Sequence, residues 1–230
     1  MRLTEEQLAH IAARADEAYC AAVRPGRLDR VDVMRLARVL GYRVALHRLS
    51  TDGSVCGLIT PHGARVPVYD NGRREYVTTD GHLILIERAL RLDPSLLGVL
   101  HYTTAHELAH GLMADFLPAG GGLHDVGCAG TEPQADRLAA RLLMPERLVV
   151  PCLAHFALPK RMRSLNDELG RQFNFARKFE KMAQYLQVSQ QALSIRLHDM
   201  GVLRLQPAVQ HRVREACWDI FPEEGEWIDE

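Results

Sequence analysis

The pentapeptide His106-Glu107-Leu108-Ala109-His110 constrains this chain more than any other feature of its sequence. Its two histidines are four residues apart, and a glutamate directly follows the first of them. On a helix, positions i and i+4 lie on the same face, so both imidazoles can bind one metal ion. Imidazole is a good zinc ligand, and the glutamate is placed where it can take a proton from water at the metal. The pattern therefore predicts a helix that carries a zinc site.

The sequence on either side of the motif is compatible with such a helix. Asp93-Pro94-Ser95 is typical of a helix start, and the residues from Leu96 to Met113 are mostly good or neutral helix formers. Gly111 would weaken the helix close to the motif, by about 1 kcal/mol relative to alanine. We expect the helix to be broken at Pro118 and at the three glycines that follow it.

A catalytic zinc site needs three protein ligands and an open position for water. In one class of such sites a third histidine follows the motif, but Phe116 occupies that position here. Another class takes a glutamate from a later helix, where Glu132 and Asp136 are four residues apart. Glu132 can supply the third ligand, and Asp136 can accept a hydrogen bond from a ligating histidine and orient its ring. His124 and Asp125, in a glycine-rich segment, are rival third ligands that have less rigid support.

The segment from Thr131 to Pro145 is typical of a helix. Thr131 is a good N-cap residue, Pro133 stands at an early helical position, and Pro145 ends the pattern. Each candidate also has an ordinary structural interpretation: the histidines could lie on a helix surface and bind nothing. Glu132 could interact with the helix dipole, and Asp136 could make a contact within its own helix. The combination of the two segments favours a metal site over these interpretations.

Three segments taken together resemble the ImmA/IrrE family of zinc metallopeptidases: residues 104–110, residues 132–136 and residues 139–145. The resemblance covers roughly residues 30–205. It implies a cytoplasmic bacterial or phage enzyme that binds Zn²⁺. Its protein substrate would be a helix-turn-helix repressor, which it would cleave or inactivate, derepressing genes for stress response or mobile elements.

By the same resemblance, His106, His110 and Glu132 would be the zinc ligands and Glu107 the general base. The family often has asparagine where Asp136 stands, so the orienting role is retained here with an unusual charge. A donor that stabilises the oxyanion is also needed. The sequence offers three candidates for this donor and does not choose among them: Tyr102, His101 and His124.

The predicted fold class is α+β, with a small mixed or antiparallel sheet before a zincin-type helix and a helix-turn-helix-like subdomain after it. Helices are expected over residues 4–22 and 28–40. Strands are expected over residues 42–49, 55–60, 64–69, 76–79 and 82–87, with a turn at Asp70-Asn71-Gly72. We expect an edge strand from residues 55–87 to hold a substrate peptide as an added strand.

Residues 179–197 predict a helix, a tight turn and a second helix capped by Ser189, the layout of a helix-turn-helix. If the second helix entered a major groove, four side chains would be candidate base contacts: Gln190, Gln191, Ser194 and Arg196. Such a helix pair is more often a packing unit, so direct DNA binding is the less favoured interpretation. Residues 160–181 hold seven basic and three acidic side chains, and this stretch could equally meet an acidic protein partner.

The chain divides by pattern into a metallopeptidase-like part, residues 1–158, a helix-turn-helix-like part, residues 159–206, and an acidic tail, residues 207–230. Two alternatives to a repressor-directed endopeptidase stay open. One is a DNA-binding transcriptional regulator whose zinc is structural. The other is a module that binds a repressor without cleaving it.

Charge and cysteine usage bear on the partners and the compartment. The formal net charge of −1 implies no global attraction to nucleic acid. Five cysteines with no C-x-x-C pair favour a reducing cytosol over a disulfide framework. Cys128 could cap the zinc, although a small buried or loop residue is the more common role. Because the N-terminus is charged and no long apolar stretch follows, we expect a cytoplasmic protein without a membrane partner.

Overall fold

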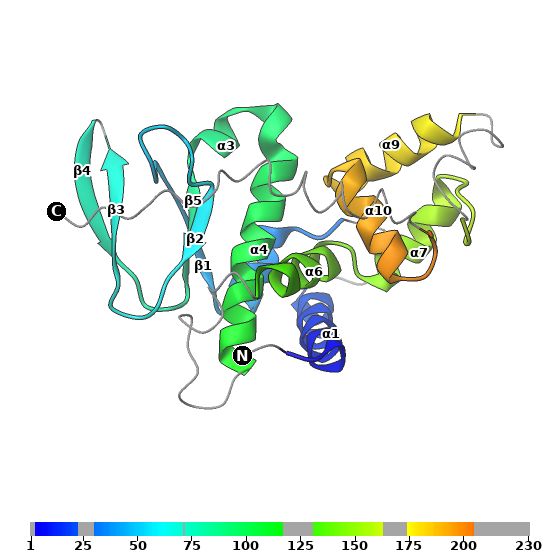
Figure 1. Ribbon diagram of the computed structural model, residues 1–230, viewed down its shortest axis with the longest axis horizontal. Coiled ribbons are helices and arrows are strands. Elements are labelled where there is room, and N and C mark those ends of the chain that lie inside the picture. The colour runs from blue at the N-terminus through cyan, green and yellow to red at the C-terminus, as the bar shows by residue number, and fades with distance from the viewer. Residues whose placement is uncertain (1–2, 23–29, 71, 117–130, 163–173, 205–230) are drawn as a thin grey trace.

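The computed structural model describes residues 3–22, 30–70, 72–116, 131–162 and 174–204. The long helix α4 (Leu97–Phe116) runs through the middle of the molecule (Figure 1). The strands lie on one side of α4, and most of the other helices lie on the opposite side. This arrangement confirms the mixed α+β class and places the pentapeptide between the strands and the helices.

Two helices begin the chain, and local capping explains where each begins. In α1 (Glu5–Ala22) the backbone N–H of Gln7 donates to Thr4 Oγ1 at 3.2 Å, and that of Thr4 donates to Gln7 Oε1 at 2.7 Å. The second helix, α2 (Val33–Val39), is shorter than the predicted 28–40. It begins at Val33 because the Asp32 carboxylate accepts a hydrogen bond from the backbone N–H of Arg35 at 3.1 Å.

Five strands follow, near the predicted positions: β1 (Arg43–His47), β2 (Gly57–Ile59), β3 (Arg65–Asp70), β4 (Arg73–Thr78) and β5 (Leu83–Glu87). They form two sheets, so the prediction of a single sheet was wrong. One is a mixed sheet in the order β1-β5-β2, with β1 parallel and β2 antiparallel to β5. The other is the antiparallel hairpin of β3 and β4, which turns at the predicted position.

The central strand β5 is buried along its whole length because both of its faces are covered. Ile84 and Ile86 belong to the core that the sheet shares with the helices. Leu83 and Leu85 belong to a second cluster with Val66 and Val68 of the hairpin. The hairpin therefore covers the face of β5 that α4 leaves uncovered, which explains why the strands divide into two sheets.

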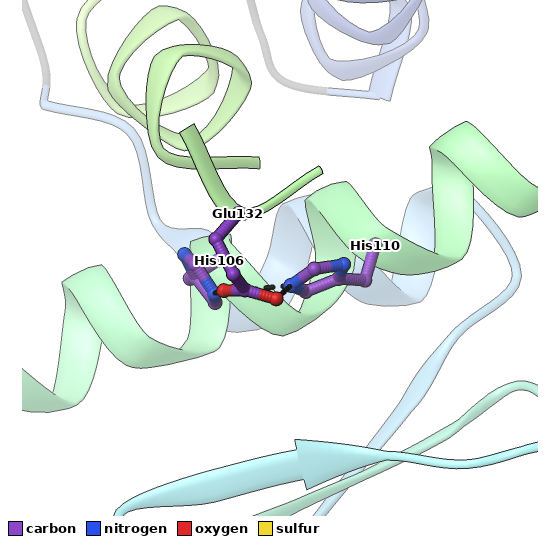
Figure 2. A group of neighbouring side chains, drawn as sticks. All are labelled: His106, His110 and Glu132. Carbon is purple, nitrogen blue, oxygen red and sulfur yellow. Dashed lines mark hydrogen bonds and ion pairs between the residues drawn. The ribbon is translucent and has the colours of Figure 1, made fainter. Parts of the chain in front are cut away.

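The motif helix begins after α3 (Ala89–Leu92) and the short 3₁₀ turn η1 (Pro94–Leu96). At the predicted start signal, Asp93 accepts a hydrogen bond from the backbone N–H of Ser95 at 2.8 Å. Helix α6 (Glu132–Leu143) packs against α4 and begins at the predicted place. Figure 2 shows His106 and His110 of α4 facing Glu132 of α6.

The C-terminal helices confirm the predicted elements. Helix α7 (Glu146–His155) follows Pro145, and α9 (Phe175–Leu186) and α10 (Gln190–Asp199) are joined by a short turn. The hydroxyl of Ser189 accepts a hydrogen bond from the backbone N–H of Ala192 at 3.0 Å, the predicted cap. Two of the four conditional candidate base contacts, Ser194 and Arg196, are buried. Arg196 Nε donates to the carbonyl of Met144 at 2.9 Å, and the hydroxyl of Ser194 donates to the carbonyl of Gln190 at 2.7 Å.

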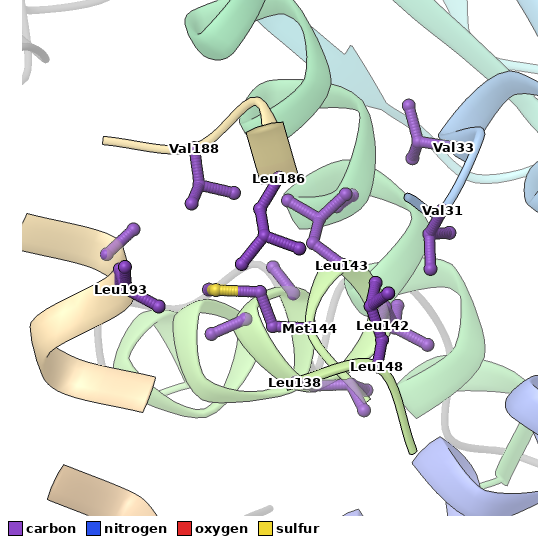
Figure 3. Close-up of a cluster of buried hydrophobic side chains, with 14 of the residues drawn as sticks. Val31, Val33, Leu138, Leu142, Leu143, Met144, Leu148, Leu186, Val188 and Leu193 are labelled. Atoms are coloured by element: carbon purple, nitrogen blue, oxygen red, sulfur yellow. The ribbon is translucent and has the colours of Figure 1, made fainter. Parts of the chain in front are cut away.

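The core is continuous from the first helices to the last. Leu186, Val188 and Leu193 of the C-terminal pair lie against Leu138 and Met144 of the α6 region (Figure 3). The division at residue 158 stays a prediction, and the described helices on its two sides share this core. The predicted acidic tail lies outside the described residues. None of the described helices is long and apolar enough to cross a lipid bilayer.

Candidate metal centre

Three side chains from two helices converge on one point (Figure 2). His106 and His110 project from adjacent turns of α4, and Glu132 is the first residue of α6. Glu132 Oε2 lies 3.0 Å from His106 Nε2, and Glu132 Oε1 lies 3.2 Å from His110 Nε2. The two histidine Nε2 atoms are 3.1 Å apart. The structure thus brings the three predicted ligands together.

The spacing and chemistry of these donor atoms fit one divalent cation. Bonds of about 2.1 Å in a tetrahedral arrangement place neighbouring donor atoms about 3.4 Å apart. The observed separations of 3.0–3.2 Å are close to this value. Two facing Nε2 atoms repel each other when both carry lone pairs, and a cation between them, or hydrogen on one of them, removes that repulsion. The group can therefore hold a metal ion, with both histidines nearly buried, at 7% and 6% exposure.

The charged neighbours at the convergence point shift the pKa values of two of the three candidate ligands, His106 and Glu132. Burial alone would lower the pKa of His106, but its hydrogen bonds with Asp136 and Glu132 raise that pKa to about 10. Burial alone would raise the pKa of Glu132, but hydrogen bonds from His106 and His110 hold it at about 2. The raised pKa of His106 and the lowered pKa of Glu132 both indicate that the site favours positive charge at the convergence point.

Asp136 lies one turn after Glu132 on α6, and its Oδ1 is 3.0 Å from His106 Nδ1. In a neutral, metal-bound His106 this contact would place the ring hydrogen on Nδ1 and leave Nε2 directed at the convergence point. The buried Nδ1 of His110 has no hydrogen-bond partner among the described residues. The orienting role of Asp136 stays a prediction, now supported by a measured contact.

Glu107 points from α4 toward the sheet, on the side where β2 crosses the helix. Its carboxylate accepts a hydrogen bond from the backbone N–H of Ile59, and burial raises its pKa. A Cβ atom on Gly57 would lie only 2.5 Å from Thr103 Cγ2 and 3.3 Å from Glu107 Cγ. Only a glycine lets β2 approach the motif helix this closely.

Gly57 was missed in the sequence. A glycine inside a short strand pattern, between Val55 and Thr60, was the available signal, since such a glycine often marks a close approach of another element. The pattern does not say which element approaches.

The other candidates have different surroundings or lie outside the described residues. The hydroxyl of Tyr102 donates to Asp136 Oδ1 at 2.9 Å. His101 has Arg30 and Asp32 as its charged neighbours, and burial lowers its pKa. His124, Asp125 and Cys128 fall in the segment 117–130, which lies outside the described residues.

The sequence was compared with models of protein families and with curated proteins. No family model matches it, and no curated protein matches it significantly. The geometry of the site therefore carries the functional argument.

Proposed function

We propose that this protein is a zinc-dependent endopeptidase. One observation carries the proposal: α4 and α6 together form a His-His-Glu group, and a second carboxylate of α4, Glu107, lies beside it and meets the edge strand β2. Among the described residues the group has three ligands, and two histidines, one glutamate and a water form the ligand set of a known class of catalytic zinc sites. A structural zinc site would instead be closed by four protein ligands.

Zinc bound here would supply Lewis acidity, which lowers the pKa of water and polarises a peptide carbonyl. Glu107 would accept the proton of the attacking water and later pass it to the leaving amine. The raised pKa of Glu107 suits this exchange, because an acid–base group works best when its pKa is near the working pH. Asp136 and His106 would hold their contact throughout, so that the ligand does not rotate.

The edge of β2 that faces away from β5 offers a place for an extended peptide. Among the described strands, β2 pairs with β5 alone. The N–H of Glu87 in β5 donates to the carbonyl of Cys56 at 2.8 Å. Because backbone groups alternate in direction along a strand, those of Gly57 and Ile59 face away from β5. The Ile59 N–H already meets Glu107, so a peptide added along this edge would lie beside the proposed general base.

A helix-turn-helix repressor is the proposed substrate, and its support is the resemblance of residues 104–110, 132–136 and 139–145 to repressor-directed peptidases. Burial of Arg196 and Ser194 removes two of the four candidate base contacts, which weakens the alternative of direct DNA binding.

The test is incubation of the protein with the repressor encoded beside its gene, with and without a chelator. We expect a new repressor fragment only in the chelator-free reaction. Glu107→Gln should abolish the fragment and leave metal binding unchanged, because Glu107 lies outside the ligand group. Glu75→Gln, on the exposed strand β4, is the matched control and should cleave normally.

Each alternative outcome has a distinct result. Cleavage by Glu107→Gln at the parent rate would refute the assigned mechanism. A stable complex that survives both Glu107→Gln and chelation would identify a repressor-binding module. Salt-dependent binding of operator DNA without proteolysis would identify a DNA-binding regulator.

A further inference from the structure

Tyr102 belongs to the metal centre through a chain of two contacts. Its hydroxyl donates to Asp136 Oδ1 at 2.9 Å. The same Oδ1 atom lies 3.0 Å from His106 Nδ1. Tyr102 precedes His106 by one turn of α4, and their ring centroids are 6.3 Å apart. One carboxylate oxygen of α6 therefore meets two side chains of α4.

The two contacts restrain the Asp136 side chain, which could otherwise adopt other rotamers. The Asp136 side chain is 32% exposed, so water competes for its carboxylate. A single contact with His106 would leave the carboxylate free to rotate toward solvent. The Tyr102 hydroxyl adds a second donor from the same rigid helix, and an oxygen held by two donors has less freedom to turn away.

The same restraint extends to the third ligand. Glu132 and Asp136 lie one turn apart on α6, so they move together as parts of one helix. Anchoring Asp136 on α4 at both Tyr102 and His106 fixes the register between the first turn of α6 and the motif helix. Glu132 is then held in position to contact His106 and His110 before a metal ion binds.

We propose that Tyr102 is a positioning residue, which holds Asp136 and through it sets the geometry of His106 and Glu132 for metal binding. This inference rests on the metal centre of the proposed function. Tyr102 is therefore not the oxyanion donor considered from the sequence, because its hydroxyl is directed at Asp136.

The test compares Tyr102→Phe with the parent protein in Zn²⁺ affinity and in the visible spectrum of bound Co²⁺. Phenylalanine keeps the ring and removes only the hydroxyl. We expect affinity for Zn²⁺ to fall about tenfold, the low end for residues that support metal ligands. We also expect the Co²⁺ absorption bands to shift, because they report the ligand geometry. Tyr76→Phe, on the exposed strand β4, is the matched control and should change neither measurement.

A double-substitution cycle separates positioning from a general loss of stability. On an Asp136→Ala background, Tyr102→Phe should cause no further loss of affinity, because the hydroxyl then has no carboxylate to hold. Unchanged affinity and an unchanged Co²⁺ spectrum in Tyr102→Phe would overturn the inference, as would equal losses on both backgrounds. If the parent protein itself bound neither Zn²⁺ nor Co²⁺, the metal centre would fail, and the proposed function with it.

Discussion

Gly111 directly follows the second motif histidine, His110. For Gly111→Ala, helix propensity predicts a gain in stability, whereas the packing in the structure predicts a loss. Helix propensity alone favours Gly111→Ala by about 1 kcal/mol. In the structure, the new Cβ would lie 2.5 Å from Tyr42 Cε1 and 2.8 Å from both Tyr42 Cζ and the Tyr42 hydroxyl oxygen. The ring cannot move away easily, because Tyr42 is 2% exposed and its hydroxyl donates to Asp115.

The net effect follows from the two opposing contributions. Overpacking a buried site typically costs about 1–3 kcal/mol, and close contact with two ring carbons and the hydroxyl oxygen of Tyr42 argues for the upper end. Subtracting the propensity gain of about 1 kcal/mol leaves a net loss of about 2 kcal/mol in the free energy of unfolding. Metal affinity should also fall, because His110 lies on the turn that the Tyr42 ring would displace.

The assay is urea unfolding of the metal-free protein, and the same helix supplies a matched control. A Cβ on Gly98 would meet only the backbone oxygen of Gln187, at 3.7 Å, which is ordinary contact. Gly98→Ala should therefore stabilise the protein, by up to about 1 kcal/mol. On a Tyr42→Leu background, Gly111→Ala should lose most of its cost. If Gly111→Ala were as stable as the parent while Gly98→Ala behaved as expected, the packing argument would be wrong.

Three further predictions concern the sheet edge, the proton released on zinc binding and the pH dependence of stability. Gly57→Ala should reduce cleavage and should lower the free energy of unfolding by about 1–3 kcal/mol. Adding Thr103→Ser should partly restore both, because it removes the methyl group that lies 2.5 Å from the new Cβ. Cleavage and unfolding of Gly57→Ala identical to those of the parent protein would contradict this. The pKa of His106 is about 10 without metal, so Zn²⁺ binding at neutral pH should release about one proton, and Zn²⁺ affinity should increase as pH rises. Calorimetry in buffers of different ionisation enthalpy measures the number of protons released. In the metal-free protein, the contribution of protonated His106 to stability should be complete below about pH 6.5, the ordinary histidine pKa, and be lost as pH rises through about 10. Zinc binding without proton release would count against this charge state.

The site could be predicted from sequence to the extent that its residues follow helix periodicity. His106 and His110 share a face of α4, and Glu132 and Asp136 share a face of α6, because each pair is four residues apart. That the two faces meet was inferred from the resemblance and from the need for a third ligand. The measured contacts of 3.0–3.2 Å now support that inference.

What the sequence determined by itself is local: the helices, their caps at Thr4 and Ser189, the turn after β3 and the apolar run of β5. These features depend on residues within a few positions of one another. Tertiary structure decided the rest, because the partners are distant in sequence: Tyr102 meets Asp136 across 34 residues, and Arg196 meets Met144 across 52. The role of such a side chain, whether it supports a ligand, contacts a base or donates a buried hydrogen bond, depends on the distant atom that it contacts. Residue spacing along the chain does not predict that contact.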